Sequence, residues 1–353
     1  MVASSILLAV ILTMLAPQLT GANVPSLFVL GDSIADVGTN SFIANSKARA
    51  DFPFNGIDFP NSRATGRFSN GFNTADYVAK LMGFKRSPQP FLYLVTIKSG
   101  LQRLKFRGVN FASGGSGILD QTGQDLKVVP LSEQIKQFAT VRSNLTVAMG
   151  PEKTPMFLSE SIFSIGIGSN DILGYFSTNS TVPQEQFING LMNVYESYIK
   201  SLYSLGARKF GIISVPPLGC IPSQRIFNST GGCFEIINDF SRSFHSKLST
   251  MLLKISSEFP AMKYSIGNIY EITMNFIDNP LLFNFKDVET ACCGNGKQAC
   301  TPSASLCLNR SEYLFWDSYH PTQAASLLGV ENLYRGGERY VSPINFSKLT
   351  GEH

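Results

Sequence analysis

The segment from Phe28 to Asn40, FVLGDSIADVGTN, joins an apolar run to a series of small and acidic residues. The aromatic and branched side chains stop at Gly31, which predicts a buried strand that meets a sharp turn. Ser33 then lies just beyond the strand, where its hydroxyl is accessible. Most serines at turns only cap helices or bond to their own backbone. A chemical role for Ser33 therefore requires a base, an orienting acid and oxyanion donors elsewhere in the chain.

Strand-like apolar runs alternate with longer helical patterns, which predicts a parallel sheet covered by helices on both faces. The predicted strands are Ser26 to Leu30, Gly108 to Ala112, Ile162 to Ile167, Phe210 to Val215 and Tyr264 to Ile269. Between the third and fourth strands, apolar residues recur at helical spacing from Phe187 to Leu205, and Gly206 ends this helix. A second helix carries its stripe from Ile237 to Ile255 and stops before Pro260. Both stripes indicate core packing.

In such a sheet, ligands bind outside the carboxyl ends of the strands. Ser33 follows the first predicted strand. The segment NFASGGSGIL, residues 110–119, follows the second strand, and its glycines let backbone N–H groups approach a ligand closely. The segment GIGSNDIL, residues 166–173, follows the third strand and offers the side-chain amide of Asn170 as a donor. We therefore expect these segments to meet at one edge.

The hydroxyl of Ser33 needs a base to accept its proton, and the chain has three histidines. His353 is the last residue, and His245 lies in a helical pattern where packing or surface exposure is the better interpretation. His320 remains. Asp317, three residues earlier, is placed to accept a hydrogen bond from the imidazole and to stabilise its charged form. The alternative is that Asp317 caps a helix and His320 lies on the surface, which is the commoner outcome for an isolated D-x-x-H pattern.

The attacked carbonyl oxygen needs hydrogen-bond donors already in place, each worth about 3 to 4 kcal/mol in comparable enzymes. The candidates are the backbone N–H groups of Ser33 and Gly115 and the side chain of Asn170. The alternatives are that the glycines form a flexible turn and that Asn170 caps a helix.

Four segments carry a resemblance to a known family: FVLGDSIADVGTN, GVNFASGGSGIL, SIGIGSNDIL and FWDSYHPTQAA. Their order and spacing resemble the four signature blocks of the plant secreted GDSL esterase/lipase family, a branch of the SGNH hydrolases. The segments GARKFGIISVPPLGCIP and ACCGNG are also similar to that family. The similarity thus extends over most of the chain.

The resemblance implies a three-layer α/β/α flavodoxin-like fold with a central, mostly parallel, five-stranded sheet. It implies Ser33 as nucleophile, His320 as base and Asp317 as the residue that orients the base. Gly115, which we align with the family glycine in preference to Gly114, and Asn170 join the Ser33 amide in the oxyanion hole. Asp36 and Asn40 also match family positions, and we assign them turn and capping roles.

Residues 1–22 are predicted to be a signal peptide, which leaves residues 23–353 as a single hydrolase domain. The apolar run from Ile6 to Ala16 is too short to span a bilayer but suits a signal-peptide core, and Ala22 ends a small-residue cleavage site. Residues 1–5 contain no Lys or Arg, a departure from the usual pattern. Glycosylation sequons begin at Asn144, Asn179, Asn228, Asn309 and Asn345. Together these features predict a secreted, extracellular protein, with the cell wall among its possible locations.

The six cysteines are even in number and lie in the last two fifths of the chain: Cys220, Cys233, Cys292, Cys293, Cys300 and Cys307. In an oxidising compartment they predict three disulfides, with a local bridge between the first two. The sequence does not determine how the last four cysteines pair with one another. Zinc binding by those four is an alternative, but their spacing matches structural zinc sites poorly.

The net charge of +4 is spread along the chain without a basic stripe, so we expect no nucleic-acid partner. No later apolar run approaches membrane-spanning length. We therefore predict a secreted serine esterase or lipase that hydrolyses small-molecule, lipid or polysaccharide esters through an acyl-enzyme on Ser33, without metal or cofactor. The alternatives are an acyltransferase with the same triad, and a secreted binding or defence protein with incidental hydrolase activity. The substrate depends on loops such as 45–61, whose Phe52, Phe54 and Phe59 line an acyl site or only pack.

Overall fold

The computed structural model describes residues 24–97, 100–101, 107–296 and 300–351. At its centre lies a sheet with the strand order β2-β1-β3-β4-β5-β8. The first five of these run parallel: β1 (Leu27–Gly31), β2 (Gly108–Asn110), β3 (Ile162–Gly166), β4 (Lys209–Ile213) and β5 (Lys263–Gly267). Their order is that of the flavodoxin-like fold, which confirms the predicted fold class.

All five predicted strands are present, and β8 (Val341–Ser342) adds a sixth that pairs antiparallel with β5. Its two residues are too few to produce an alternating pattern in the sequence. The strand ends differ from the predicted ends by one or two residues. For example, β2 stops at Asn110, whose side-chain oxygen accepts a hydrogen bond from the Ala112 N–H at 2.9 Å.

The two faces of the sheet carry side chains of different size. One row across β1, β3, β4 and β5 is aromatic and consists of Phe28, Phe163, Phe210 and Tyr264. The next row points to the opposite face and consists of Val29, Ser164, Gly211 and Ser265. The sheet therefore has one face with large side chains and one face with small side chains, which we call the small-residue face.

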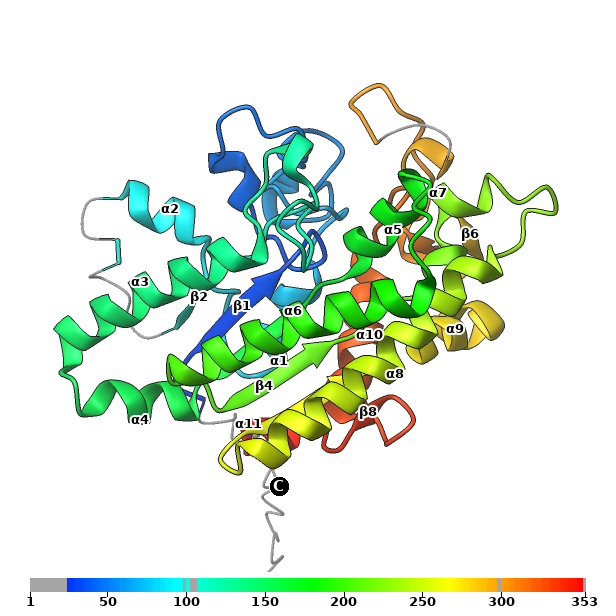
Figure 1. Cartoon of the computed structure of the whole chain (residues 1–353). Coiled ribbons are helices and arrows are strands. Elements are labelled where there is room, and N and C mark those ends of the chain that lie inside the picture. Colours follow the sequence, from blue (N-terminus) through cyan, green and yellow to red (C-terminus); the bar gives the residue numbers. More distant parts are fainter. Residues whose placement is uncertain (1–23, 98–99, 102–106, 297–299, 352–353) are drawn as a thin grey trace, which may run out of the picture.

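The aromatic face is covered by α3 (Leu131–Met149), α6 (Gln184–Ser204) and α8 (Glu235–Glu258), which lie in front of the sheet in Figure 1. The ring of Phe138 in α3 packs on Phe28 and Phe163 with centroid distances of 5.2 and 5.0 Å. Helices α6 and α8 are the two helices that the sequence predicts. Their apolar stripes are buried, which confirms the packing interpretation.

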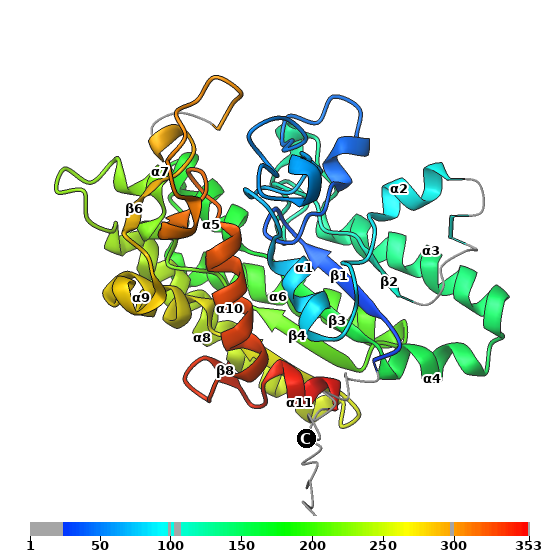
Figure 2. The ribbon, with the colours of Figure 1, turned by 180° about the vertical axis from the view of Figure 1, so that it is seen from behind.

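The small-residue face is covered by α1 (Thr74–Leu81), α9 (Ile269–Asp278), α10 (Gln323–Arg335) and α11 (Phe346–Thr350), seen from behind in Figure 2. A Cβ added at Gly211 would lie 2.9 Å from the Phe346 ring in α11. A Cβ added at Gly267 would lie 2.1 Å from the Leu333 Cδ2 in α10. The small side chains thus let these two helices approach the sheet closely.

Several short elements lie outside this frame: α2 (Phe91–Thr96), α4 (Lys153–Glu160), α5 (Ser169–Ser177) and α7 (Pro222–Arg225). A second, two-stranded sheet that the sequence did not predict pairs β6 (Asp287–Ala291) with β7 (Tyr313–Phe315). The disulfides are Cys220–Cys233, Cys292–Cys307 and Cys293–Cys300. Since all six cysteines are paired in this way, none is available for the alternative zinc site.

Within the described residues, no helix is long and apolar enough to cross a bilayer. The predicted signal peptide, residues 1–22, and His353 lie outside the described residues.

Candidate active site

Ser33 follows a turn that requires glycine at position 31. Gly31 has a φ of +143°, and a Cβ there would lie 2.2 Å from the carbonyl oxygen of Gly166 in β3. The buried side chain of Gln134 in α3 accepts a hydrogen bond from the Gly31 N–H and donates one to its C=O, both at 2.9 Å. The end of β1 is therefore held firmly, and Ser33 follows it, half buried.

Asp317 and His320 lie in the short loop between β7 and α10. One carboxylate oxygen of Asp317 accepts hydrogen bonds from the backbone N–H groups of Tyr319 and His320, both at 2.8 Å. The Trp316 N–H donates to the carbonyl oxygen of His320 at 2.7 Å and closes the loop. These bonds hold the carboxylate and the imidazole in a defined relation to each other.

The structure brings the three predicted residues into one hydrogen-bonded chain. The Nδ1 of His320 lies 2.8 Å from each carboxylate oxygen of Asp317, and its Nε2 lies 2.8 Å from the Oγ of Ser33. His320 is only 8% exposed, and the ring of Phe68 lies beside it with a centroid distance of 5.0 Å. This arrangement can move a proton from the hydroxyl to the imidazole while the carboxylate stabilises the resulting charge.

His245 lies in α8 and is half buried there. Its Nδ1 has no hydrogen-bond partner in the described part of the chain, and burial lowers the pKa of the imidazole. Of the two roles that the sequence favours for this histidine, packing or surface exposure, these observations fit packing.

The three predicted oxyanion donors each keep an N–H hydrogen that is not used elsewhere among the described residues. Among the described residues, the N–H groups of Ser33 and Gly115 donate no hydrogen bond. The Nδ2 of Asn170 donates to the carbonyl oxygen of Ser116 at 2.9 Å, which leaves its second hydrogen available. Asn170 lies in the first turn of α5 and donates rather than capping the helix, which begins after Gly168.

Two residues that the sequence assigned to turns and caps also hold the glycine loop. Asp36 accepts hydrogen bonds from the N–H groups of Gly38 at 2.7 Å, Thr39 at 2.6 Å and Gly114 at 2.9 Å. The Nδ2 of Asn40 donates to the carbonyl oxygen of Gly114 at 2.8 Å. The backbone N–H and C=O of Gly114 are therefore both bound, and because its C=O shares a peptide plane with the Gly115 N–H, the position of that N–H is set.

Buried carboxylates surround this loop. Asp171 accepts hydrogen bonds from the N–H groups of Ile118 at 2.8 Å and Leu119 at 3.0 Å, and burial raises its pKa. Burial also raises the pKa of Asp32 to about 7 and that of Asp36 to about 6. Asp36 and Asp171 each lie five residues beyond the end of a strand, β1 and β3, and acidic residues shortly after predicted strands are the sequence signal for them.

A family model described as GDSL-like Lipase/Acylhydrolase matches residues 27–331. This chain belongs to the GDSL lipase/acylhydrolase family. A GDSL esterase/lipase of Arabidopsis thaliana is 36% identical to it, over 93% of this chain and 90% of the relative. GDSL esterase/lipase 6 of the same plant is 34% identical over 97% of this chain and 96% of its own. GDSL esterase/lipase LTL1, also of Arabidopsis thaliana, is 32% identical over 96% of this chain and 93% of its own.

Among solved structures, a GDSL-like lipase from Parabacteroides merdae aligns over 94% of this chain and 99% of its own. Its sequence identity is 12% and its TM-score is 0.38. Membership of the GDSL family makes this chain a serine hydrolase that acts on ester bonds.

In this GDSL hydrolase, an apolar cavity of about 100 Å³ lies between the small-residue face of the sheet and helices α1, α9 and α10. Its lining includes Ile34 next to Ser33, and both Tyr319 and Pro321 next to His320. The cavity was not predicted from the sequence, although the small residues at alternate strand positions are a signal for it.

The loop aromatics of this GDSL hydrolase are engaged in packing. Phe54 packs against a buried cluster that contains Trp316 and cystine side chains. The Phe59 ring packs on Phe72 with a centroid distance of 4.8 Å. For these two residues the structure supports packing over the acyl-site alternative.

The sequon asparagines differ in how available their side chains are. Asn179 and Asn309 are exposed. The Nδ2 atoms of the others donate hydrogen bonds within the protein: Asn144 to the Thr140 carbonyl at 2.9 Å, Asn228 to that of Cys233 at 3.1 Å, and Asn345 to that of Gly336 at 3.4 Å. Glycosylation remains a prediction, and the two exposed asparagines suit it best.

Proposed function

We propose that this GDSL hydrolase is a secreted esterase that cleaves carboxylic esters through an acyl-enzyme on Ser33. The observation that carries the proposal is the continuous hydrogen-bonded chain from Asp317 through His320 to the Ser33 hydroxyl. A serine hydroxyl becomes an effective nucleophile when an adjacent, oriented base accepts its proton.

In the proposed mechanism, Ser33 Oγ forms a bond to the ester carbonyl carbon while its proton moves to the Nε2 of His320. The carbonyl oxygen becomes an oxyanion, which accepts hydrogen bonds from the free N–H groups of Ser33 and Gly115 and from Asn170. The bond to the alcohol oxygen then breaks, and the leaving oxygen takes the proton from Nε2. Water repeats these steps on the acyl-enzyme, which releases the acid and restores Ser33.

The proposal is tested by covalent labelling with a fluorophosphonate together with hydrolysis of a simple ester. Wild-type protein should be labelled, and Ser33→Ala should not. His320→Ala should remain folded and lose several orders of magnitude in kcat, as do other triad variants. An unlabelled wild type would favour a binding protein, and near-normal activity of the His320 variant would refute the role of the imidazole. A new ester formed at the expense of free acid, when alcohols are added, would indicate an acyltransferase.

Secretion is part of the proposal and is supported by three disulfides, by the exposed sequons at Asn179 and Asn309, and by the predicted signal peptide. Expression of the full chain in a eukaryotic secretory host should deliver glycosylated protein to the medium. Retention inside the cell without a glycan would contradict this part. Residues 23–353 are proposed to form the mature, single hydrolase domain.

A further inference from the structure

We propose that the apolar cavity beside Ser33 and His320 binds the acyl chain of the substrate, and that this chain is unbranched, aliphatic and of medium length, such as octanoyl. The inference rests on the proposed function, because ester cleavage at Ser33 is what presents an acyl chain to this cavity. Neither Gly115 nor Asn170 lines the cavity. The oxyanion donors and the acyl chain thus use different parts of the site.

The upper end of the cavity lies next to the segments that carry the reactive residues, although neither Ser33 nor His320 itself lines it. Ile34 directly follows Ser33, Tyr319 and Pro321 flank His320, and these three neighbours all line the cavity. Tyr319 is 53% exposed, so this end of the cavity lies near solvent. An acyl group attached to the Ser33 oxygen is therefore proposed to enter the cavity at this end.

The cavity extends inward along α10. Ala325, Gly329 and Leu333 line it and lie on successive turns of that helix, which begins close to His320 and runs away from it. Eight residues of α-helix span about 12 Å. Leu333 lies at the far end, where its Cδ2 would contact a Cβ added at Gly267. This depth suits an extended medium-length chain and is too short for the chain of a long fatty acid.

Small residues create the space. Ala75 on α1 and Gly166 on β3 line the cavity together with Gly329. The atom closest to a Cβ added at Gly329 is the Cδ1 of Ile269, at 3.6 Å, an ordinary van der Waals contact. A larger side chain at position 329 would therefore extend into the cavity instead of meeting the backbone.

The side chains that line the cavity also favour a hydrocarbon acyl chain over a polar one. At the deep positions on α10, Val330 and Leu333 present hydrocarbon side chains, and Gly329 has no side chain beyond hydrogen. Ser214 lies at the carboxyl end of β4, and its buried hydroxyl has no hydrogen-bond partner among the described residues. The lining also holds other polar side chains, among them Asp32, Ser164 and Ser326, but hydrocarbon side chains outnumber the polar ones. A sugar-bearing acyl group would leave most of its hydroxyl groups without a partner in this lining, at a substantial cost.

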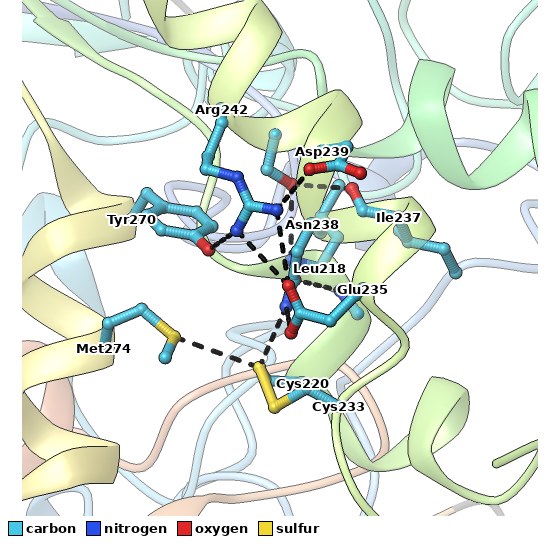
Figure 3. Close-up of polar contacts among 12 residues, drawn as sticks. Leu218, Cys220, Cys233, Glu235, Ile237, Asn238, Asp239, Arg242, Tyr270 and Met274 are labelled. Carbon is cyan, nitrogen blue, oxygen red and sulfur yellow. Dashed lines mark hydrogen bonds and ion pairs between the residues drawn. A yellow bond between two sulfur atoms is a disulfide. The ribbon is translucent and has the colours of Figure 1, made fainter.

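One wall of the cavity is held in place before any substrate arrives, and it consists of Pro216, Pro217 and Ile221. Figure 3 shows how the residues between these positions are attached to α8. The Cys220–Cys233 disulfide joins this wall to the segment just before α8, and Asn238 accepts a hydrogen bond from the Gly219 N–H at 2.9 Å. A preformed wall lowers the entropy lost when a chain binds.

The first test measures kcat/KM for p-nitrophenyl acetate, octanoate and palmitate with wild type, Gly329→Leu and the control Gly190→Leu. Gly190 is an exposed glycine inside α6, and a Cβ there would have no neighbour within 4 Å. Wild type should prefer octanoate. Gly329→Leu should lower kcat/KM for octanoate by about 10- to 100-fold and change that for acetate by less than about two-fold. The control should keep the wild-type preference.

A parallel loss on acetate and octanoate in a folded Gly329→Leu would overturn the proposal, as would a wild type that prefers acetate or palmitate. Leu333→Ala provides the opposite change, because it lengthens the cavity. It should raise the ratio of dodecanoate to octanoate kcat/KM by about ten-fold. If Gly329→Leu does not fold, the ratio of dodecanoate to octanoate kcat/KM in Leu333→Ala is the deciding measurement. An unchanged ratio would then overturn the proposal.

Failure of the proposed function looks different from failure of the acyl-chain proposal. A wild type that neither reacts with a fluorophosphonate nor hydrolyses acetate would refute the esterase itself, and the acyl-chain proposal with it. A wild type that does both, with no dependence on residues 329 and 333, would refute only the acyl-chain proposal.

Discussion

At the residue scale, buried polar side chains shape the site by binding peptide groups. Gln134 holds the Gly31 peptide, while Asp36 and Asn40 hold the Gly114 peptide. Each of these side chains comes from a different segment than the group it binds, so the reacting atoms are positioned by long-range contacts. The hydroxyl, the imidazole and the N–H groups can act together on an ester only when the side chains that position them are in place.

Asn170 provides a first prediction at this scale. Asn170→Ala should lower kcat by about 100-fold or more and leave KM nearly unchanged, because the amide stabilises charge that develops only in the transition state. Steady-state kinetics on a simple ester would measure this, with the exposed Asn193 in α6 as the control for the same substitution. An effect confined to KM would instead assign Asn170 to substrate binding.

Asp32 provides a second prediction, on stability. Burial raises its pKa from 3.8 to about 7, so between about pH 4 and pH 7 the folded protein keeps a proton that the unfolded chain releases. The free energy of unfolding therefore falls as the pH rises through this window. Asp32→Asn removes this titration and keeps an oxygen that can accept the Ile34 N–H, a bond of 3.1 Å in the wild type.

The variant should exceed the wild type in free energy of unfolding above pH 7, by at most about 4 kcal/mol, and the two should converge below about pH 4. Urea unfolding at a series of pH values measures this difference. A difference that does not change with pH would mean that Asp32 titrates alike in the folded and unfolded chains.

At the element scale, glycines have opposite consequences according to where they lie. Gly168 precedes α5 with a φ of +121°, and a Cβ there would lie 2.6 Å from the Phe244 ring. Gly190 lies inside α6, exposed and without neighbours. The first glycine permits a close approach of α5 and α8, whereas the second only weakens its helix.

These two positions form a matched pair for a third prediction. Gly190→Ala should raise the free energy of unfolding by about 0.5 to 1 kcal/mol, because alanine favours the helix interior. Gly168→Ala should lower it by roughly 1 to 3 kcal/mol through steric conflict and backbone strain. Denaturant unfolding of both variants compares them directly. Equal effects of the same sign would contradict the structural account.

At the scale of the whole molecule, the site depends on segments from opposite ends of the chain. The loop that carries Asp317 and His320 follows β7, and its start is held by β6: the N–H groups of Cys292 and Cys293 donate to the carbonyls of Phe315 and Trp316 at 3.0 and 2.7 Å. The adjacent disulfides tie this small sheet to residues 300–307. The disulfides therefore support the loop that carries the base.

This support leads to a fourth prediction. The double substitution of Cys292 and Cys307 by alanine removes a disulfide whose cysteines lie 15 residues apart in the sequence. The free energy of unfolding should fall by about 3 kcal/mol, as expected for a loop of this length. Urea unfolding under non-reducing conditions measures the change. A loss below about 1 kcal/mol would show that the second sheet holds its shape without this bridge.

The sequence by itself determined the five parallel strands, the two long helices and the candidate residues Ser33, Asp317 and His320. These follow from local patterns, because burial imposes a period of two on strands and 3.6 on helices, and because the signature segments are contiguous. Only the tertiary structure decided how the last four cysteines pair and that an apolar cavity lies next to the segments that carry Ser33 and His320. Both depend on which distant segments pack together, and no local pattern encodes the distance between them.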